Sequence, residues 1–107
     1  MARISGLSGD DETPVFVISV AAELAGMHAQ TLRQYDRMGL VIPSRTRGGG
    51  RRYSAADVTR LREVQRLSQD EGVSLGGIQR IFELEHQVAA LRARVEELDA
   101  ELAEARE

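Results

Sequence analysis

The chain of 107 residues contains no cysteine. This absence excludes disulfides, zinc fingers, thiolate catalysis, and thiol-based metal or redox sensing. No apolar run approaches the roughly 18 residues of a membrane-spanning helix. The N-terminus lacks a charged head followed by an apolar stretch, so we expect no signal peptide and a soluble, cytoplasmic protein. A chain this short fits one small domain plus an appendage, and a partner chain often completes so thin a core.

Lysine is also absent, and the positive charge comes from arginines that are concentrated in one segment. The formal net charge is −3. Between His28 and Arg66, however, nine arginines stand against three acids (+6), whereas the remainder has five arginines against fourteen acids (−9). A basic segment in an acidic chain is typical of a nucleic-acid-binding surface, with an ordinary solvated helical face as the alternative.

The first half of the chain predicts a strand followed by two short helices. Residues 1–14 are polar and are expected to form a disordered tail, and residues 15–18 suit a short strand. Ser19 is expected to cap a first helix that ends at Gly26. A second helix is expected from about residue 29 to 38, and Gly39 ends it. The apolar face expected for the first helix consists of Val20, Ala21, Leu24 and Ala25.

Residues 40–53 lose the helical pattern and predict a hairpin. Its strands are expected at residues 40–42 and 51–53, with the glycines at 48–50 at the tip. Ser54 then begins a third helix, with Asp57 completing a capping box, and Gly72 ends it. Ser74 is expected to cap a last helix that starts around residue 75 and continues toward the C-terminus.

The C-terminal stretch has a heptad repeat, which predicts a coiled coil and therefore a homodimer. Charged residues beside the repeat select a register but do not distinguish a parallel from an antiparallel pair. A long amphipathic helix packed on its own domain is the alternative. The seam residues expected to make the dimer are Ile81, Leu84, Val88, Leu91, Val95, Leu98 and Leu102.

Two helices joined by a tight turn at Gly26 indicate a helix-turn-helix, whose second helix enters the major groove of DNA. The arginines around the glycine-rich hairpin tip can neutralise phosphate, and glycine allows close approach of the backbone. A nucleotide-binding loop is the alternative, but the spacing of a phosphate-binding P-loop is absent. The predicted DNA contacts are Ser19, His28, Gln30, Thr31, Arg33, Gln34, Tyr35, Arg37, Arg45, Arg47, Gly49, Arg51, Arg52 and Tyr53.

Three of these residues have a second interpretation. Tyr35 and Tyr53 either place their hydroxyls on phosphate or pack in the core, and His28 either contacts DNA or caps the second helix. Neither His28 nor His86 has a plausible triad or metal partner in the sequence, so we expect no enzyme activity, no metal site and no cofactor.

Residues 20–61 resemble the MerR family of winged helix-turn-helix regulators. The resemblance rests on Thr31-Leu32-Arg33-x-Tyr35-Asp36-Arg37-x-Gly39-Leu40, on Pro43-x-Arg45, on Arg52-Tyr53 and on Asp57-Val58-x-x-Leu61. Within that family, residues 28–37, 48–54 and 61–73 are most similar to the HspR-type heat-shock repressors. The expected fold is therefore mainly α, with a winged helix-turn-helix domain at residues 15–78 and a dimerisation helix at residues 79–107.

The resemblance implies an antiparallel coiled coil and recognition of an inverted repeat, with the wing gripping the flanking phosphates. It also implies repression of chaperone genes, with the chaperone DnaK as co-repressor. The chain lacks the cysteines of metal-sensing relatives and ends before the ligand domain of drug-sensing ones. A small-molecule-responsive activator of the same family and a coiled-coil adaptor without DNA function are the alternative hypotheses.

Overall fold

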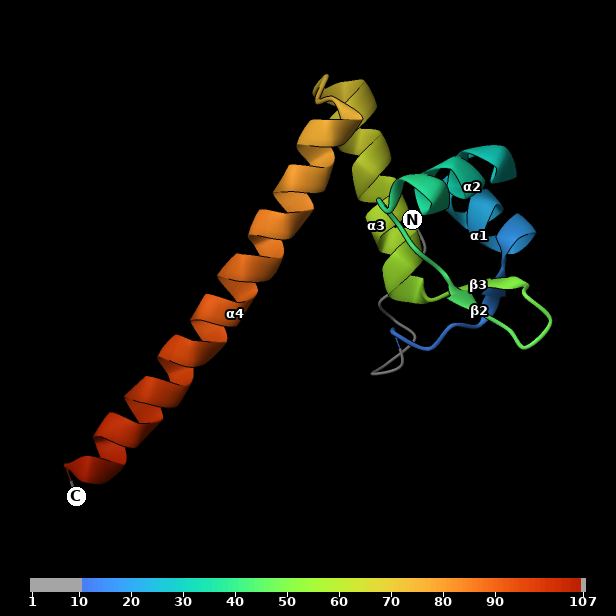
Figure 1. Ribbon diagram of the computed structural model, residues 1–107. Helices are drawn as coiled ribbons and strands as arrows, with labels where there is room; N and C mark the ends of the chain where they lie inside the picture. The colour runs from blue at the N-terminus through green and yellow to red at the C-terminus, as the bar shows by residue number, and fades with distance from the viewer. Residues whose placement is uncertain (1–10, 107) are drawn as a thin grey trace. The chain divides into compact units, whose positions relative to one another are not determined.

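A computed structural model describes residues 11–106, and most of the expected N-terminal tail lies outside the described residues. The chain divides into two compact units, one up to Gly72 and the other from Val73. The expectation of a mainly α fold with a long last helix is confirmed (Figure 1). The elements are β1 (Phe16–Val17), α1 (Ile18–Ala25), α2 (Ala29–Met38), β2 (Ser44–Arg45), β3 (Arg51–Tyr53), α3 (Ala55–Gln65), the π-helical turn η2 (Arg66–Asp70) and α4 (Leu75–Ala105).

The strands form a small antiparallel sheet in the order β1-β3-β2, in which Phe16 pairs with Tyr53 and Ser44 pairs with Arg52. The strand predicted at residues 40–42 is wrong, because β2 begins only after Pro43. Leu40 and Val41 instead direct their backbone N–H groups to the carbonyl oxygen of Tyr35, at 2.9 and 3.4 Å. These bonds serve a carbonyl oxygen in the last turn of α2, so the two N–H donors are unavailable to a sheet.

The start of α1 also differs from the prediction. The helix begins at Ile18 after Val17, and no side chain caps it, so Ser19 lies exposed within the first turn. Val17 is already paired with Arg52 in the sheet, and the chain passes directly from that ladder into the helix. The buried face of α1 is made by Ala21, Ala22 and Ala25, while Val20 is 41% exposed.

The predicted capping of the later helices is confirmed. Ser54 Oγ accepts a hydrogen bond from the Asp57 N–H at 3.0 Å, and Asp57 Oδ2 accepts one from the Ser54 N–H at 2.9 Å. Ser74 Oγ likewise accepts from the Gly77 N–H at 3.0 Å. The third helix stops being α-helical after Gln65 and continues as η2, whereas the prediction extended it to Gly72. Gly72 itself has a φ of +67°.

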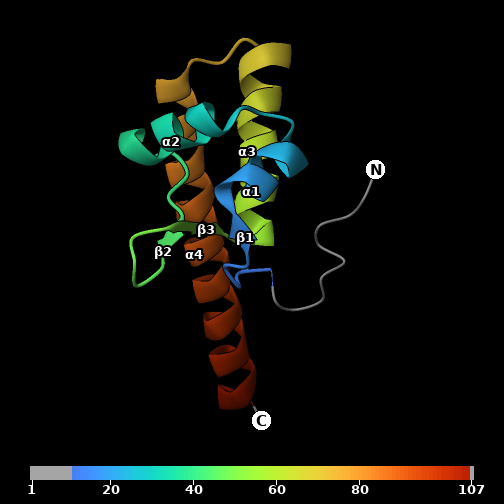
Figure 2. The same ribbon diagram turned by 90° about the vertical axis from the view of Figure 1, so that its right-hand side faces the viewer.

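The core of the first unit lies where α1 packs against α2 and α3 and where the sheet meets α1 (Figure 2). Its fully buried members come from all of these elements, which fixes α2 and the β2–β3 hairpin on one scaffold. The largest of them are Leu32, Val41, Tyr53, Val58, Leu61 and Val64.

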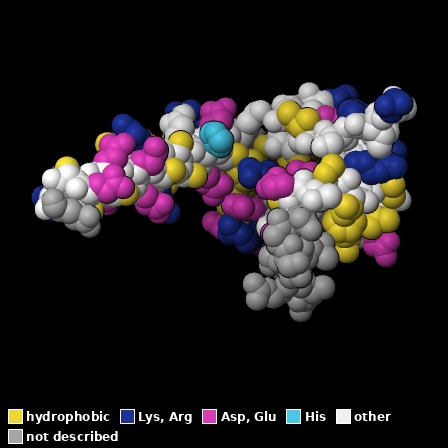
Figure 3. Space-filling view, turned by 90° about the horizontal axis from the view of Figure 1, so that it is seen from below, with side chains coloured by type: hydrophobic (Ala, Val, Ile, Leu, Met, Phe, Trp, Pro, Cys, Tyr) yellow, Lys and Arg dark blue, Asp and Glu magenta, His cyan; other side chains and the backbone are white. Residues whose placement is uncertain are grey.

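The second unit contains α4, a continuous helix of 31 residues. The apolar heptad positions from Leu84 to Leu102 are between 43% and 65% exposed. Figure 3 shows yellow apolar side chains between the charged ones along this helix. Among the described residues, none of the helices combines the length and apolar character needed to cross a membrane.

Candidate nucleic-acid interface

The turn between α1 and α2 is held by backbone geometry. Gly26 has a φ of +70°, in the left-handed region where glycine avoids the strain that a side chain causes. The Gly26 and Met27 N–H groups donate to the carbonyl oxygens of Glu23 (3.1 Å) and Ala22 (2.9 Å). His28 then occupies the position before α2, but its side chain makes no capping hydrogen bond and is exposed. The tight turn of a helix-turn-helix is therefore present.

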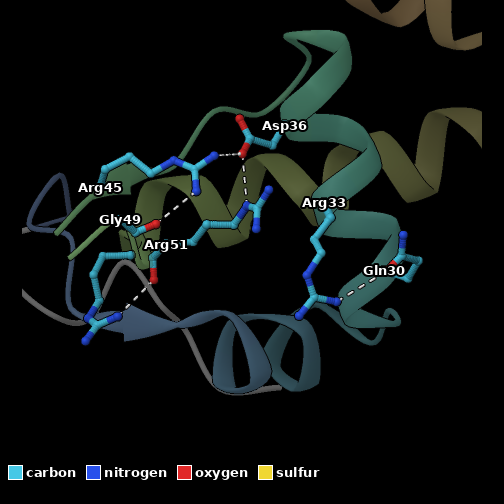
Figure 4. A network of polar contacts seen from close by, with 7 residues as sticks. Gln30, Arg33, Asp36, Arg45, Gly49 and Arg51 are labelled. Carbon is cyan, nitrogen blue, oxygen red and sulfur yellow. Dashed lines mark hydrogen bonds and ion pairs between the residues drawn. The ribbon is translucent and has the colours of Figure 1, made fainter.

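One face of α2 is polar and accessible. Leu32 on the opposite face is fully buried in the core. Arg33 Nη1 donates to Gln30 Oε1 at 3.3 Å, one turn earlier on the same helix (Figure 4). Thr31 and Arg33 are half-buried, and the exposed members of the predicted set on or just before α2 are His28, Gln30, Gln34 and Arg37.

The two tyrosines lie in the core rather than at the surface. Tyr35 is 8% exposed and Tyr53 is completely buried. Burial raises the pKa of both phenols, and for Tyr53 the nearby Asp36 carboxylate adds to that rise. The Tyr53 hydroxyl has no hydrogen-bond partner among the described residues. This burial favours the core-packing interpretation of Tyr53 over the phosphate contact.

Tyr35 borders a small polar pocket of about 280 Å³ at the helix-turn-helix turn. Tyr35 is therefore less enclosed than Tyr53, although its side chain is also mostly buried. The pocket is lined by Gly26, Met27, His28, Thr31, Tyr35, Gln65, Ser68 and Gln69.

The hairpin tip is a folded turn. The Gly49 N–H donates to the Thr46 carbonyl oxygen at 2.9 Å, and the Gly50 N–H donates to Thr46 Oγ1 at 3.0 Å. Gly49 has a φ of +88°, which a side chain rarely adopts. Arg47 is exposed at the tip and makes no ion pair within the part of the chain that the structure describes. It is a cation available to an external anion.

Arg45 and Arg51, by contrast, share an internal partner that sequence reasoning did not single out. Arg45 Nη2 and Arg51 Nε donate to the same oxygen of Asp36, Oδ2, at 2.7 and 2.9 Å (Figure 4). Arg45 Nη1 also donates to the Gly49 carbonyl oxygen at 3.2 Å. Asp36 was visible as one of only three acids in the basic segment, and that rarity was the available signal.

Together these elements define a winged helix-turn-helix, in which a polar helix and an arginine-rich hairpin stand on one core. In both ribbon views α2 and the hairpin loop project from the same side of this unit (Figures 1 and 2). Figure 3 shows dark-blue arginine side chains gathered on one side of it. The described residues contain no group of histidine and acidic side chains that is arranged to hold a metal ion.

Residues 16–85 match the family model described as the MerR helix-turn-helix family of regulatory proteins. The match covers more than half of the chain, so the chain belongs to this family. The members of this family are transcription regulators rather than enzymes.

Three known proteins show how far the similarity extends. A Streptomyces coelicolor protein that bears the name heat shock protein HspR is 67% identical over 92 residues, which cover 86% of this chain and 61% of that protein. The chain thus spans about three fifths of this relative's length.

Two solved structures share the fold. The crystal structure of a MerR family regulator from Bacillus cereus has a TM-score of 0.58 and 29% identity, covering 82% of this chain and 75% of that one. The crystal structure of HiNmlR, a MerR family regulator lacking the sensor domain and bound to promoter DNA, has a TM-score of 0.59 and 29% identity, covering 85% and 75%.

Proposed function

We propose that the protein represses heat-shock chaperone genes by binding an inverted-repeat operator as a homodimer. The observation that carries this proposal is the 67% identity to HspR. A match of 92 residues in a chain of 107 necessarily includes both α2 and the hairpin. The elements expected to recognise DNA are therefore part of the similarity, and they favour a similar operator.

In this proposal α2 lies in the major groove and its exposed polar side chains read base edges. Arg33 and Gln34 are the principal readers, since arginine and glutamine each form two parallel hydrogen bonds with a base. The hairpin, hereafter the wing (residues 44–53), holds the phosphate backbone through arginine and through the close approach of Gly49. The wing arginines are Arg45, Arg47, Arg51 and Arg52.

The homodimer would form along the apolar seam of α4, as an antiparallel coiled coil. Leu91 and Val95 are 65% and 55% exposed in the single chain, and seam residues of this kind are normally buried by a partner helix. The proposed interface comprises Ile81, Leu84, Val88, Leu91, Val95, Leu98 and Leu102. We place the DNA-binding part at residues 15–78 and the dimerisation part at residues 79–107.

DnaK is the proposed co-repressor, so that the amount of free chaperone reports heat stress. DNase footprinting on chaperone promoters of the source organism, with and without DnaK, tests the whole proposal. We expect protection of two half-sites whose centres lie about one or two helical turns apart. Protection of no inverted repeat would contradict the repressor function, whereas protection that DnaK leaves unchanged would contradict only the co-repressor.

A further inference from the structure

Asp36 connects α2 to both strands of the wing through a single oxygen. Arg45 lies on β2 and Arg51 on β3, and both donate to Asp36 Oδ2 (Figure 4). The Asp36 side chain is only 11% exposed, against 21% for Arg51 and 48% for Arg45. Charge-assisted hydrogen bonds in so sheltered a place are stronger than neutral ones. The wing is thereby fixed at a set distance from the proposed reading helix.

The same contact changes the charge that the wing presents to DNA. The single carboxylate of Asp36 cancels one of the two positive charges on Arg45 and Arg51. An arginine has five N–H donors in a rigid fork, and Asp36 takes one from each side chain. Donors remain on both guanidiniums for phosphate, but their direction is set by α2.

We propose that Asp36 is a positioning residue that determines the sequence specificity of DNA binding; this inference rests on the proposed function. Without Asp36 the wing would keep its core contacts, but the side chains of Arg45 and Arg51 would no longer be oriented by α2, and the wing would carry one more uncompensated charge. It would then hold any phosphate backbone, whether or not α2 has found its bases. With Asp36 in place, the wing arginines point correctly at the phosphates only where α2 lies in the major groove.

The test compares two duplexes: one that the wild-type protein selects from a random-sequence pool, and a shuffled duplex of the same length and composition. For Asp36→Asn, we expect the ratio of affinities for the selected and shuffled duplexes to fall about tenfold. Affinity for the shuffled duplex should rise, and the salt dependence of that binding should steepen by about one unit of slope. Asp36→Glu, which keeps the charge, should restore part of the ratio.

Glu23→Gln is the matched control, because it removes one negative charge from an exposed site on α1 that is not joined to the wing. Its affinity ratio should stay at the wild-type value. An equal fall for Glu23→Gln and Asp36→Asn would overturn the inference, since net charge alone would then explain both. An unchanged ratio for Asp36→Asn, with both affinities lowered alike, would overturn it as well.

A second pair of variants avoids the buried carboxylate in case Asp36→Asn fails to fold. Arg45→Gln breaks the half-exposed arm of the contact, whereas Arg47→Gln removes a wing arginine that forms no ion pair with any residue the structure describes. Both variants should bind the two duplexes more weakly, but only Arg45→Gln should also lower the ratio of affinities for the selected and shuffled duplexes. Equal ratios for the two variants would contradict the positioning role. If the wild-type protein selects no sequence from the pool, the proposed function fails instead.

Discussion

The guanidinium of Arg62 in α3 donates two hydrogen bonds to the backbone carbonyl oxygen of Leu24 in α1, from Nε at 3.0 Å and from Nη2 at 2.7 Å. Leu24 lies in the last turn of α1, where carbonyl oxygens have no partner within the helix. A cation at this end also interacts favourably with the helix dipole. Arg62 therefore caps the C-terminal end of α1 with a side chain that comes from another helix, α3.

Replacing Arg62 should destabilise the fold more than its position on a helix surface suggests. We expect Arg62→Ala to lower the free energy of unfolding by about 2 kcal/mol, since it leaves a partly buried carbonyl unpaired. Arg66→Ala is the control, because both members of its ion pair with Glu71 are about half exposed. Such pairs contribute at most about 1 kcal/mol. Urea unfolding followed by circular dichroism measures both, and equal losses would argue against the capping role.

Tyr53 presents the opposite situation, a buried hydroxyl without a partner among the described residues. Tyr53→Phe removes the cost of burying that group, so we expect the free energy of unfolding to rise by about 1 kcal/mol. Tyr53→Ala should lower it by about 4 kcal/mol because a cavity replaces the ring. A clear loss of stability in Tyr53→Phe would mean that the hydroxyl is hydrogen-bonded in solution.

The same tyrosine gives a prediction for alkaline pH. Burial, assisted by the Asp36 carboxylate, raises the pKa of Tyr53 above the ordinary 10.0. The folded state then holds the phenolic proton more tightly than the unfolded state, so stability is complete below about pH 10 and falls above it. Tyr53→Phe should lose less stability than wild type above that pH. Urea unfolding at neutral and alkaline pH tests this, and parallel losses in the two proteins would contradict it.

The local signals in the sequence predicted most of the elements, because each depends on neighbours in the chain. Gly26 and Gly39 end their helices, and Ser54 with Asp57 begins another, as expected from cap chemistry alone. The strand at residues 40–42 was wrong because the backbone N–H groups of Leu40 and Val41 bond to the end of α2 instead. That competition is decided by tertiary packing, which a local pattern does not contain.

The sequence predicted which residues belong to the candidate site, but not which of them bind one another. The basic segment pointed to Arg45 and Arg51, which lie on β2 and β3, but their common partner Asp36 lies nine and fifteen residues earlier in the chain. Tyr53 was ambiguous for a similar reason. A tyrosine in a strand suits either a phosphate contact or a core, and only the burial of the β3 face places it inside.

Arg33 and Arg47 should differ in what they contribute to DNA binding. Arg33→Ala should lower affinity for the selected duplex by about tenfold to a hundredfold and leave the shuffled duplex nearly unchanged, because base contacts carry the discrimination. Arg47→Ala should weaken both alike and reduce the salt slope by about one unit. Fluorescence anisotropy at several salt concentrations separates these outcomes, and a uniform loss in Arg33→Ala would move that residue from base reading to phosphate contact.

The seam of α4 gives the test of assembly. Leu91 is 65% exposed in the single chain and would be buried in the apolar seam of the proposed coiled coil. Leu91→Asp would place a carboxylate in that apolar seam, where an unpaired charge is strongly unfavourable. We expect wild type to sediment as a dimer and Leu91→Asp as a monomer with an intact helix-turn-helix.

His86→Asp, outside the heptad seam, is the control and should remain dimeric. If Leu91→Asp sediments with the same mass as wild type, the seam is not the interface. Because an inverted repeat is read by two linked copies, the monomer should also lose the steep dependence of affinity on half-site spacing. Retention of that dependence in a monomeric variant would contradict recognition by a symmetric pair.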